Sequence, residues 1–261
     1  MILAALSSPV ESKALDKAEI WNLYREGESL FKQANELLVT DPTKAATLLE
    51  KAVLHFEAIH REGGIENGRL YYNTGNIYFR LGDTGKAILN YRRAERFIPN
   101  DINLQQNLNY ARSRCIDKID LKPQSQVFRT LFFWHYDLSG PTRSWLFAAL
   151  FGVLWVFAGI YLIKRQSWLR YAVMVSALFS VLVAVSLVVE AYEESNVRCG
   201  VVLEREVVGR KGDGTTFEPT FKEPLHMGAE FKLVEERKGW LYIELADGRR
   251  CWIPESSAGI I

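Results

Sequence analysis

The sequence predicts a multidomain membrane protein with three kinds of structure: all-α helical hairpins, a two-helix transmembrane hairpin and a small all-β barrel. Residues 69–97 place apolar and aromatic side chains at helical spacing, which predicts the hairpins. Residues 144–163 and 171–189 contain no Asp, Glu, Lys or Arg, and the chain after Gly200 alternates in short apolar runs. The 32 basic and 31 acidic side chains nearly cancel, so no nucleic-acid partner is expected.

A short break at residues 81–84 divides residues 69–97 into two predicted helices. Gly82 can close the first helix, because glycine readily adopts the left-handed backbone conformation that ends many helices. Asp83 or Thr84 can then cap the second helix by accepting a hydrogen bond from a free backbone N–H. The segment is therefore expected to form a tight helical hairpin.

Small and aromatic residues follow a fixed order in this hairpin: Tyr71, Thr74, Gly75, Tyr78, Ala87, Tyr91 and Pro99. The order resembles a tetratricopeptide repeat, with Thr74 in place of the usual Leu. One such repeat cannot bury its own apolar faces, so neighbours are required. Residues 18–60 are expected to supply an irregular repeat with an insertion, and residues 101–115 a closing helix, within a domain spanning 18–121.

The resemblance implies that the first helix of each pair lines a concave groove for a partner protein. The side chains expected there are polar or aromatic and lie on the first helix and the closing helix: Arg69, Tyr72, Asn73, Asn76, Arg80, Asn103, Gln106, Asn107 and Tyr110. Arginine and asparagine can pair with the carbonyls, amides and carboxylates of an extended peptide. An ordinary solvated polar face is the alternative interpretation.

Residues 144–163 are long enough to cross the ~30 Å hydrocarbon layer at ~1.5 Å per residue, and residues 171–189 are one residue shorter. The loop expected between them, 164–170, is basic, and the positive-inside rule places it in the cytoplasm. Both soluble domains would then be extracytoplasmic. Arg129 and Arg143 favour the inverted orientation, which stays open. The spans lack charged residues, which favours an anchor in the lipid bilayer over a transporter.

Two further segments flank these domains. Residues 1–17 combine an apolar run with small residues, and they indicate either the tail of a truncated secretory signal or a frayed terminus. Residues 122–143 form a juxtamembrane segment. Within it, residues 127–136 are expected to form an interfacial helix, with Trp134 and Tyr136 at headgroup depth.

Residues 197–261 predict a small barrel of about five short strands, separated by glycine-containing turns. The motifs Lys-Gly-Trp at Trp240, Asp-Gly-Arg, and Trp-Ile-Pro at Trp252 resemble a bacterial SH3-like domain, with Cys251 in place of the usual Gly. The two tryptophans either form an exposed platform for a ligand or contribute one ring to the core. Cys199 and Cys251 either form a disulfide or stay unpaired.

Catalytic machinery is not expected in this chain. The four histidines lie in unrelated contexts, and the three cysteines include no Cys-x-x-Cys pair. No nucleophile motif or metal-ligand spacing accompanies them. We therefore expect no enzymatic activity, no metal and no cofactor.

The order of the parts over residues 24–261 resembles the BatE-like proteins of bacterial aerotolerance operons. The resemblance is carried by the repeat and by LFFWHYDLS at residues 131–139. It implies a multi-pass scaffold of the bacterial inner membrane, whose partners are membrane proteins with von Willebrand A domains and a MoxR-type ATPase. The alternative is an envelope sensor or wall-binding protein whose barrel binds peptidoglycan or a periplasmic peptide.

Overall fold

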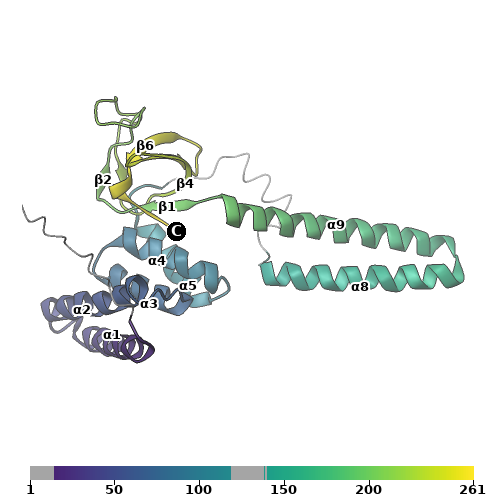
Figure 1. Ribbon diagram of the computed structural model, residues 1–261, viewed down its shortest axis with the longest axis horizontal. Coiled ribbons are helices and arrows are strands. Elements are labelled where there is room, and N and C mark those ends of the chain that lie inside the picture. The colour runs from purple at the N-terminus through teal and green to yellow at the C-terminus, as the bar shows by residue number, and fades with distance from the viewer. Residues whose placement is uncertain (1–14, 119–137, 139) are drawn as a thin grey trace, which may run out of the picture. The chain divides into compact units, whose positions relative to one another are not determined.

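The computed structural model describes residues 15–118, 138 and 140–261 (Figure 1). The chain divides into two compact units, Met1–Cys115 and Ile116–Ile261. The first unit is helical, and the second combines two long apolar helices with an antiparallel β domain. The predicted interfacial helix and nearly all of the signal-like start lie outside the described residues.

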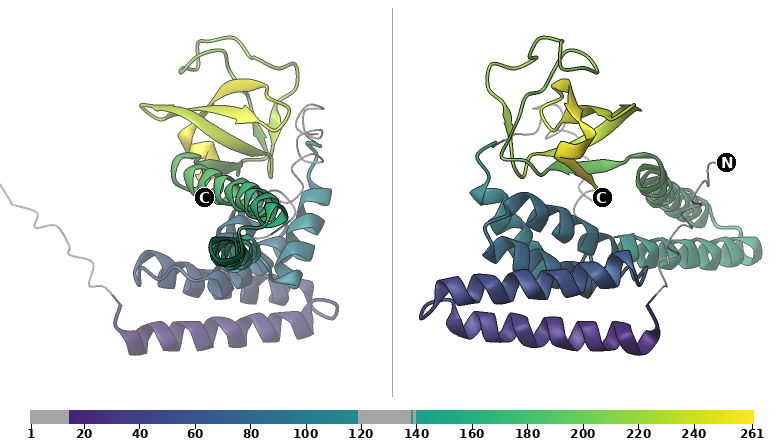
Figure 2. Two further views of the ribbon diagram at one scale, coloured as in Figure 1. Left: turned by 90° about the vertical axis from the view of Figure 1, so that its right-hand side faces the viewer. Right: turned by 60° about the vertical axis from the view of Figure 1, so that its left-hand side comes forward.

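The first unit consists of two antiparallel helical hairpins followed by a single helix. The first hairpin is formed by the long helices α1 (Lys17–Leu37) and α2 (Pro42–Arg61), which lie side by side in Figure 2. The second hairpin is shorter and is formed by α3 (Gly68–Arg80) and α4 (Thr84–Phe97). Helix α5 (Ile102–Arg114) packs on this second hairpin.

The end of α3 and the start of α4 follow the predicted signals. Gly82 has a φ of +81° and ends α3, and the Asp83 side chain caps α4 by accepting a hydrogen bond from the Lys86 N–H. Asp101 caps α5 in the same way through the Leu104 N–H. Each aspartate satisfies a backbone donor that the first turn of a helix leaves unpaired.

A glycine in the first helix of each hairpin fits against an aromatic ring in the second helix. A Cβ atom on Gly75 would lie 2.6 Å from Cδ1 of Tyr91, and one on Gly27 would lie 2.6 Å from Cε1 of Phe56. Both rings are 1% exposed. The two hairpins therefore repeat one packing arrangement, although Gly27 and Phe56 are 29 positions apart and Gly75 and Tyr91 only 16.

Two helices of the second unit are long and apolar enough to cross a membrane: α8 (Gly140–Lys164) and α9 (Ser167–Asn196). Both extend beyond the predicted spans. The predicted loop 164–170 is wrong in length, because only Arg165 and Gln166 separate the helices. A φ of +45° at Arg165 reverses the chain within these two residues, so the helix resumes at once.

The two long helices pack against each other through small side chains of α9. Ser176 and Ser180 are buried and hydrogen-bond carbonyl oxygens of their own helix. Near the other end of the hairpin, buried Arg143 donates a hydrogen bond of 2.8 Å to Ser186 Oγ. The outward sides carry large apolar groups, such as Ile163 at 84% exposure, which is the composition expected of helices that can cross a bilayer.

The β domain contains seven strands in two antiparallel sheets. The larger sheet has the order β6-β5-β4-β1-β7, and the smaller pairs β2 with β3. Their bounds are β1 (Cys199–Val202), β2 (Glu206–Val207), β3 (Leu225–His226), β4 (Glu230–Arg237), β5 (Trp240–Leu245), β6 (Arg250–Pro254) and β7 (Ala258–Ile260). Strand β3 is also held by Asp117, whose carboxylate accepts a 2.6 Å hydrogen bond from the His226 backbone N–H.

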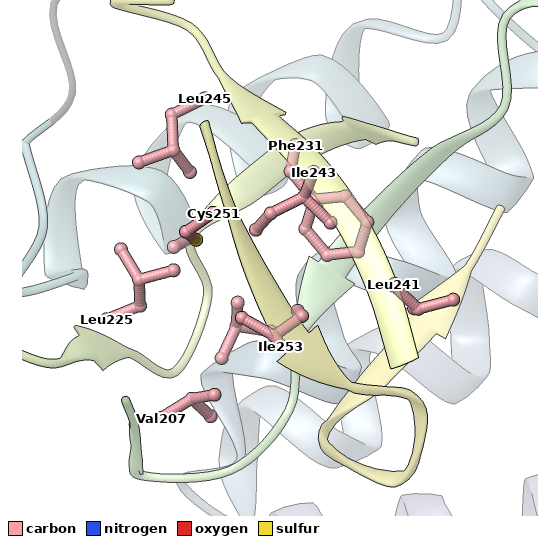
Figure 3. Close-up of a cluster of buried hydrophobic side chains, with 10 residues drawn as sticks. Val207, Leu225, Phe231, Leu241, Ile243, Leu245, Cys251 and Ile253 are labelled. Carbon is pink, nitrogen blue, oxygen red and sulfur yellow. The ribbon is translucent and has the colours of Figure 1, made fainter. Parts of the chain in front are cut away.

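Apolar side chains from six strands, β1 to β6, fill one core in this domain (Figure 3). Leu241, Ile243 and Leu245 alternate along β5 and all point into it, as a period of two residues requires. Cys251 enters the same core from β6 and lies against Gly209, where an added Cβ atom would be 2.7 Å from its sulfur. Cys251 is therefore a core residue of the sheet.

Candidate functional site

Helices α1, α3 and α5 share one face of the helical unit, here called the first-helix face. Its members come from these three helices: Tyr24, Phe31, Asn35, Arg69, Tyr72, Asn73, Asn76, Arg80, Asn107 and Tyr110. Contacts across the helices define it, because Arg80 Nε donates to Asn35 Oδ1 at 2.7 Å and Asn107 Nδ2 donates to the Tyr72 hydroxyl at 3.0 Å.

Asn76 is the centre of the hydrogen-bond network on this face. Its Oδ1 atom accepts one bond from Asn107 Nδ2 and one from the Tyr91 hydroxyl, both at 2.8 Å. Asn107 also reaches Tyr72, so one amide links α3 to α5 twice. Burial raises the pKa of Tyr91, which keeps its hydroxyl protonated and able to donate. The network thus fixes the positions of Tyr72, Asn76 and Asn107.

Arginines lie near both ends of α3. Arg80 stacks over the Phe31 ring at 5.0 Å while its Nε atom is held by Asn35, and its side chain is exposed. Arg69 is also exposed, and it lies near Tyr24. Burial and Glu28 raise the pKa of the Tyr24 hydroxyl, and Arg69 partly opposes them. The face therefore presents two separated guanidinium groups to solvent.

The predicted groove residues are brought together in part. Arg69, Tyr72, Asn73, Asn76 and Arg80 all point toward α1 or α5 and are half-buried or exposed. On α5, Asn107 joins the network and Tyr110 packs on the Phe79 ring at 5.5 Å. Asn103 and Gln106 are exposed on α5 and have no side-chain hydrogen bond within the described part of the chain.

The contribution of α1 was not predicted from the sequence. Tyr24, Phe31 and Asn35 recur at spacings of seven and four residues, which places them on one side of a helix. This spacing is the signal that could have identified them. The repeated Gly27 and Phe56 packing would have set α1 in register with α3.

The tryptophans of the β domain do not form an exposed pair. Trp252 is 7% exposed, because the Tyr242 ring stacks on it at 5.0 Å and the Arg237 guanidinium covers it at 5.1 Å. Trp240 is half-buried. The expected exposed platform is therefore incomplete, and Trp252 is buried without belonging to the core that contains its neighbours Cys251 and Ile253.

An open pocket of about 510 Å³ lies elsewhere on the β domain. Leu241, Ala258 and Ile260 contribute apolar surface to it, and Glu255 contributes a carboxylate. At its rim, Arg198 forms an ion pair of 2.9 Å with Glu236. The charged groups at the rim thus partly neutralise each other.

The comparisons with known proteins leave the family open. No protein-family model matches the chain, and no curated protein matches it. Among residues 15–118, 138 and 140–261, no group of three or more His, Cys, Asp or Glu side chains could hold a metal ion. The geometry of the first-helix face is therefore the feature that points to a function.

Proposed function

We propose that this chain is a non-enzymatic scaffold, anchored in a membrane by the α8–α9 hairpin, that docks a partner protein on its first-helix face. The observation that carries the proposal is the Asn76 network, through which α3 and α5 hold aromatic and amide groups in fixed positions. A surface organised before binding loses less entropy when a ligand orders on it.

The helical unit is, in this proposal, a short tetratricopeptide array closed by α5. The repeated fit of Gly27 on Phe56 and Gly75 on Tyr91 supports two consecutive repeats, the first lengthened by an insertion. The outer surface of α5 is exposed and polar, as a terminal capping helix needs. The β domain is assigned as a bacterial SH3-like domain.

The resemblance to BatE-like proteins is the basis for the partners and the location that we propose. We assign the chain to a Bat/MoxR-type aerotolerance complex of the bacterial inner membrane. Its partners would be membrane proteins with von Willebrand A domains and a MoxR-type ATPase. With the basic turn at Lys164 and Arg165 in the cytoplasm, the helical unit and the β domain are both extracytoplasmic.

A triple substitution tests the docking face. Replacing Asn73, Asn76 and Arg80 together by Ala should abolish co-purification of the partners that crosslink to the native protein in membranes. A matched triple variant with alanine at Gln33, Lys44 and Lys51, which are exposed on α1 and α2, should keep them. Equal partner recovery from both variants would contradict the proposal.

The alternative function places binding on the β domain, which would recognise peptidoglycan or a periplasmic peptide. The pocket beside Glu255 is the observation that favours it, since the burial of Trp252 removes half of the tryptophan platform. Retention of the full-length protein on purified cell wall would support this function if Glu255→Ala abolished it while the triple variant of the first-helix face did not.

A further inference from the structure

We propose that the first-helix face selects an extended acidic segment of its partner, with two carboxylates about five residues apart. The inference rests on the proposed docking function and specifies the chemistry of the docked segment. Three features of the face carry it: the use of its acceptors, the donors that remain, and the spacing of its arginines.

Three acceptor atoms of the face are already occupied from within the unit. Both lone pairs of Asn76 Oδ1 are used, by the Tyr91 hydroxyl and by Asn107 Nδ2. Asn107 also occupies a lone pair of the Tyr72 oxygen, and Arg80 Nε occupies Asn35 Oδ1. A ligand that mainly offers donors would therefore find the acceptor of Asn76 fully used, and those of Tyr72 and Asn35 partly used.

Some hydrogen-bond donors of the same residues are not used by any acceptor in the described part of the chain. Within the described part of the chain, the Nδ2 amide of Asn76 and the hydroxyl hydrogen of Tyr72 have no acceptor. Arg80 uses Nε internally, which leaves its two terminal nitrogens to donate outward. Carboxylates and backbone carbonyls are the acceptors that such a surplus of donors selects, and charged acceptors form the stronger bonds.

The spacing of the arginines sets the length of the segment. Arg69 and Arg80 are eleven residues apart on α3, which is close to three full turns, so they lie on one side of the helix. At a rise of ~1.5 Å per residue they are ~16 Å apart along its axis. An extended peptide covers that distance in about five residues at ~3.3 Å each. The amide of Asn76 and the hydroxyl of Tyr72 lie between them, where peptide carbonyls would pass.

One carboxylate opposes this selectivity. Glu28 on α1 is close enough to Tyr24 to raise the pKa of that hydroxyl, so it also lies near the Arg69 end of the face. The two arginines outnumber it, and the net charge of these three side chains is positive. Removing the Glu28 charge should therefore strengthen acidic binding, which damage to the fold would not do.

The test uses the full chain in neutral-lipid nanodiscs and fluorescent twelve-residue Gly/Ser peptides. One peptide carries two Asp five positions apart, and the others carry Asn at those positions, Lys at those positions, or two Asp at adjacent positions. Fluorescence anisotropy should give the spaced Asp peptide an affinity about tenfold above that of the Asn peptide, because charge-assisted bonds replace neutral ones. The Lys peptide should not bind.

Two substitutions on the face, with one control elsewhere on α1, locate the effect. Asn76→Asp keeps the oxygen that accepts from Tyr91 and Asn107 but replaces the outward amide by an anion, so affinity for the Asp peptide should fall about tenfold. Gln33→Glu makes the same chemical change on the opposite side of α1 and should have no effect. Glu28→Gln should raise the affinity severalfold, since it removes a repulsive charge.

Equal affinities for the Asp and Asn peptides, or an unchanged affinity in Asn76→Asp, would overturn the acidic assignment. Binding of anionic-lipid vesicles in preference to the Asp peptide would overturn it as well. None of these three results contradicts docking itself, because that function fails only if the triple variant of the first-helix face still recovers the partners.

Discussion

Gly75 sets the distance between α3 and α4. With hydrogen in place of a side chain, the α3 backbone rests directly on the Tyr91 ring and comes near the Ala87 carbonyl. The close approach lets the Tyr91 hydroxyl pass α3 and reach Asn76. Helix packing and the organisation of the first-helix face therefore depend on the same glycine.

Gly75→Ala should destabilise the helical unit by about 1–3 kcal/mol, the usual cost of overpacking a core. The new Cβ atom would lie 2.6 Å from Cδ1 of Tyr91 and 3.2 Å from the Ala87 carbonyl oxygen, so the helices must separate. Hydrogen exchange of α3 and α4 amides in the full chain measures the loss. Gly159→Ala in α8, where no atom lies within 4 Å, is the matched control. Unchanged protection in Gly75→Ala would contradict the packing argument.

His60 couples the stability of the helical unit to pH. Its ring stacks on Tyr71 at 4.1 Å, and its Nδ1 atom is 2.8 Å from the Ile65 carbonyl oxygen. Its Nε2 atom is buried and has no hydrogen-bond partner in the described structure. Burial lowers the pKa of His60, an effect that Arg93 increases and that the Ile65 carbonyl and nearby glutamates oppose.

Stability of the helical unit should therefore fall as the pH drops from 7 to 5. The unfolded histidine gains its proton near pH ~6.5, whereas the folded one resists, so the unfolded state binds more protons in this range. Above pH ~6.5 both states are neutral and the penalty is absent. Urea midpoints at several pH values measure the slope, which His60→Gln should reduce and His55→Gln should preserve. Equal slopes in all three proteins would exclude His60 as the cause.

At the scale of elements, the strand order determines whether Cys199 and Cys251 can form a disulfide. Cys199 lies on β1 and Cys251 on β6, with β4 and β5 between them. Three strand spacings of ~4.8 Å place the two residues ~14 Å apart, far beyond the ~7 Å limit for bridging two Cα atoms. The predicted alternative of two unpaired cysteines is therefore the one that the sheet allows.

Reducing agents should leave the stability of the β domain unchanged. Burial raises the pKa of the Cys251 thiol to about 12, so almost no reactive thiolate is present near neutral pH. Under native conditions an alkylating reagent should label half-buried Cys199 faster than Cys251, and urea should remove the difference. Mass spectrometry of the labelled peptides measures both rates. A Cys199–Cys251 disulfide in the oxidised protein would refute the strand order.

Local signals made many of these elements predictable. Gly82, Asp83 and Asp101 act at the helix ends through their own backbone and side-chain chemistry, so the sequence alone identifies them. The length of the α8–α9 turn was missed, because the basic residues that bias membrane orientation can equally continue a helix. Composition therefore located the spans but could not locate their ends.

The side chains of the candidate site were predictable on α3 and in part on α5, but their contacts were not. Spacing places Arg69, Tyr72 and Asn76 on one side of that helix, whereas the bond between Asn76 and Asn107 depends on how α5 crosses α3. The insertion in the first hairpin also obscured the correspondence of Gly27 with Gly75. Tertiary contacts of this kind leave no recognisable pattern in a single amino-acid sequence.

At the scale of the whole molecule, the number of spans links the locations of the two soluble parts. Two spans return the chain to the side it came from, so residues before α8 and after α9 share a compartment if both helices cross. Lys164, Arg165 and Arg170 cluster at the turn. At the other end, Arg143 is 3% exposed and bonded to Ser186, which ties this charge to the hairpin itself.

A reporter enzyme that is active only outside the cytoplasm should give signal when fused after Ile261 and none when fused at Gln166. The reason is the basic turn, because Lys and Arg near a span are retained on the cytoplasmic side. Replacing Lys164, Arg165 and Arg170 by Gln should weaken the asymmetry, whereas Gln at Lys232, Lys238 and Arg249 in the β domain should not. The reverse pattern in the native chain would move both soluble parts and their partners to the cytoplasm.

The length of helix α9 also sets the distance between the candidate span and the β domain. Its 30 residues extend ~45 Å, about half as long again as the ~30 Å hydrocarbon layer. The candidate span ends at Val189, and the helix continues to Asn196, which adds about 10 Å. Only Val197 and Arg198 join it to β1, and a linker of two residues extends at most ~7 Å. If α9 crosses a bilayer as proposed, this short connection keeps the β domain close to the end of the helix, and a torque or tilt applied to the domain passes into the helix.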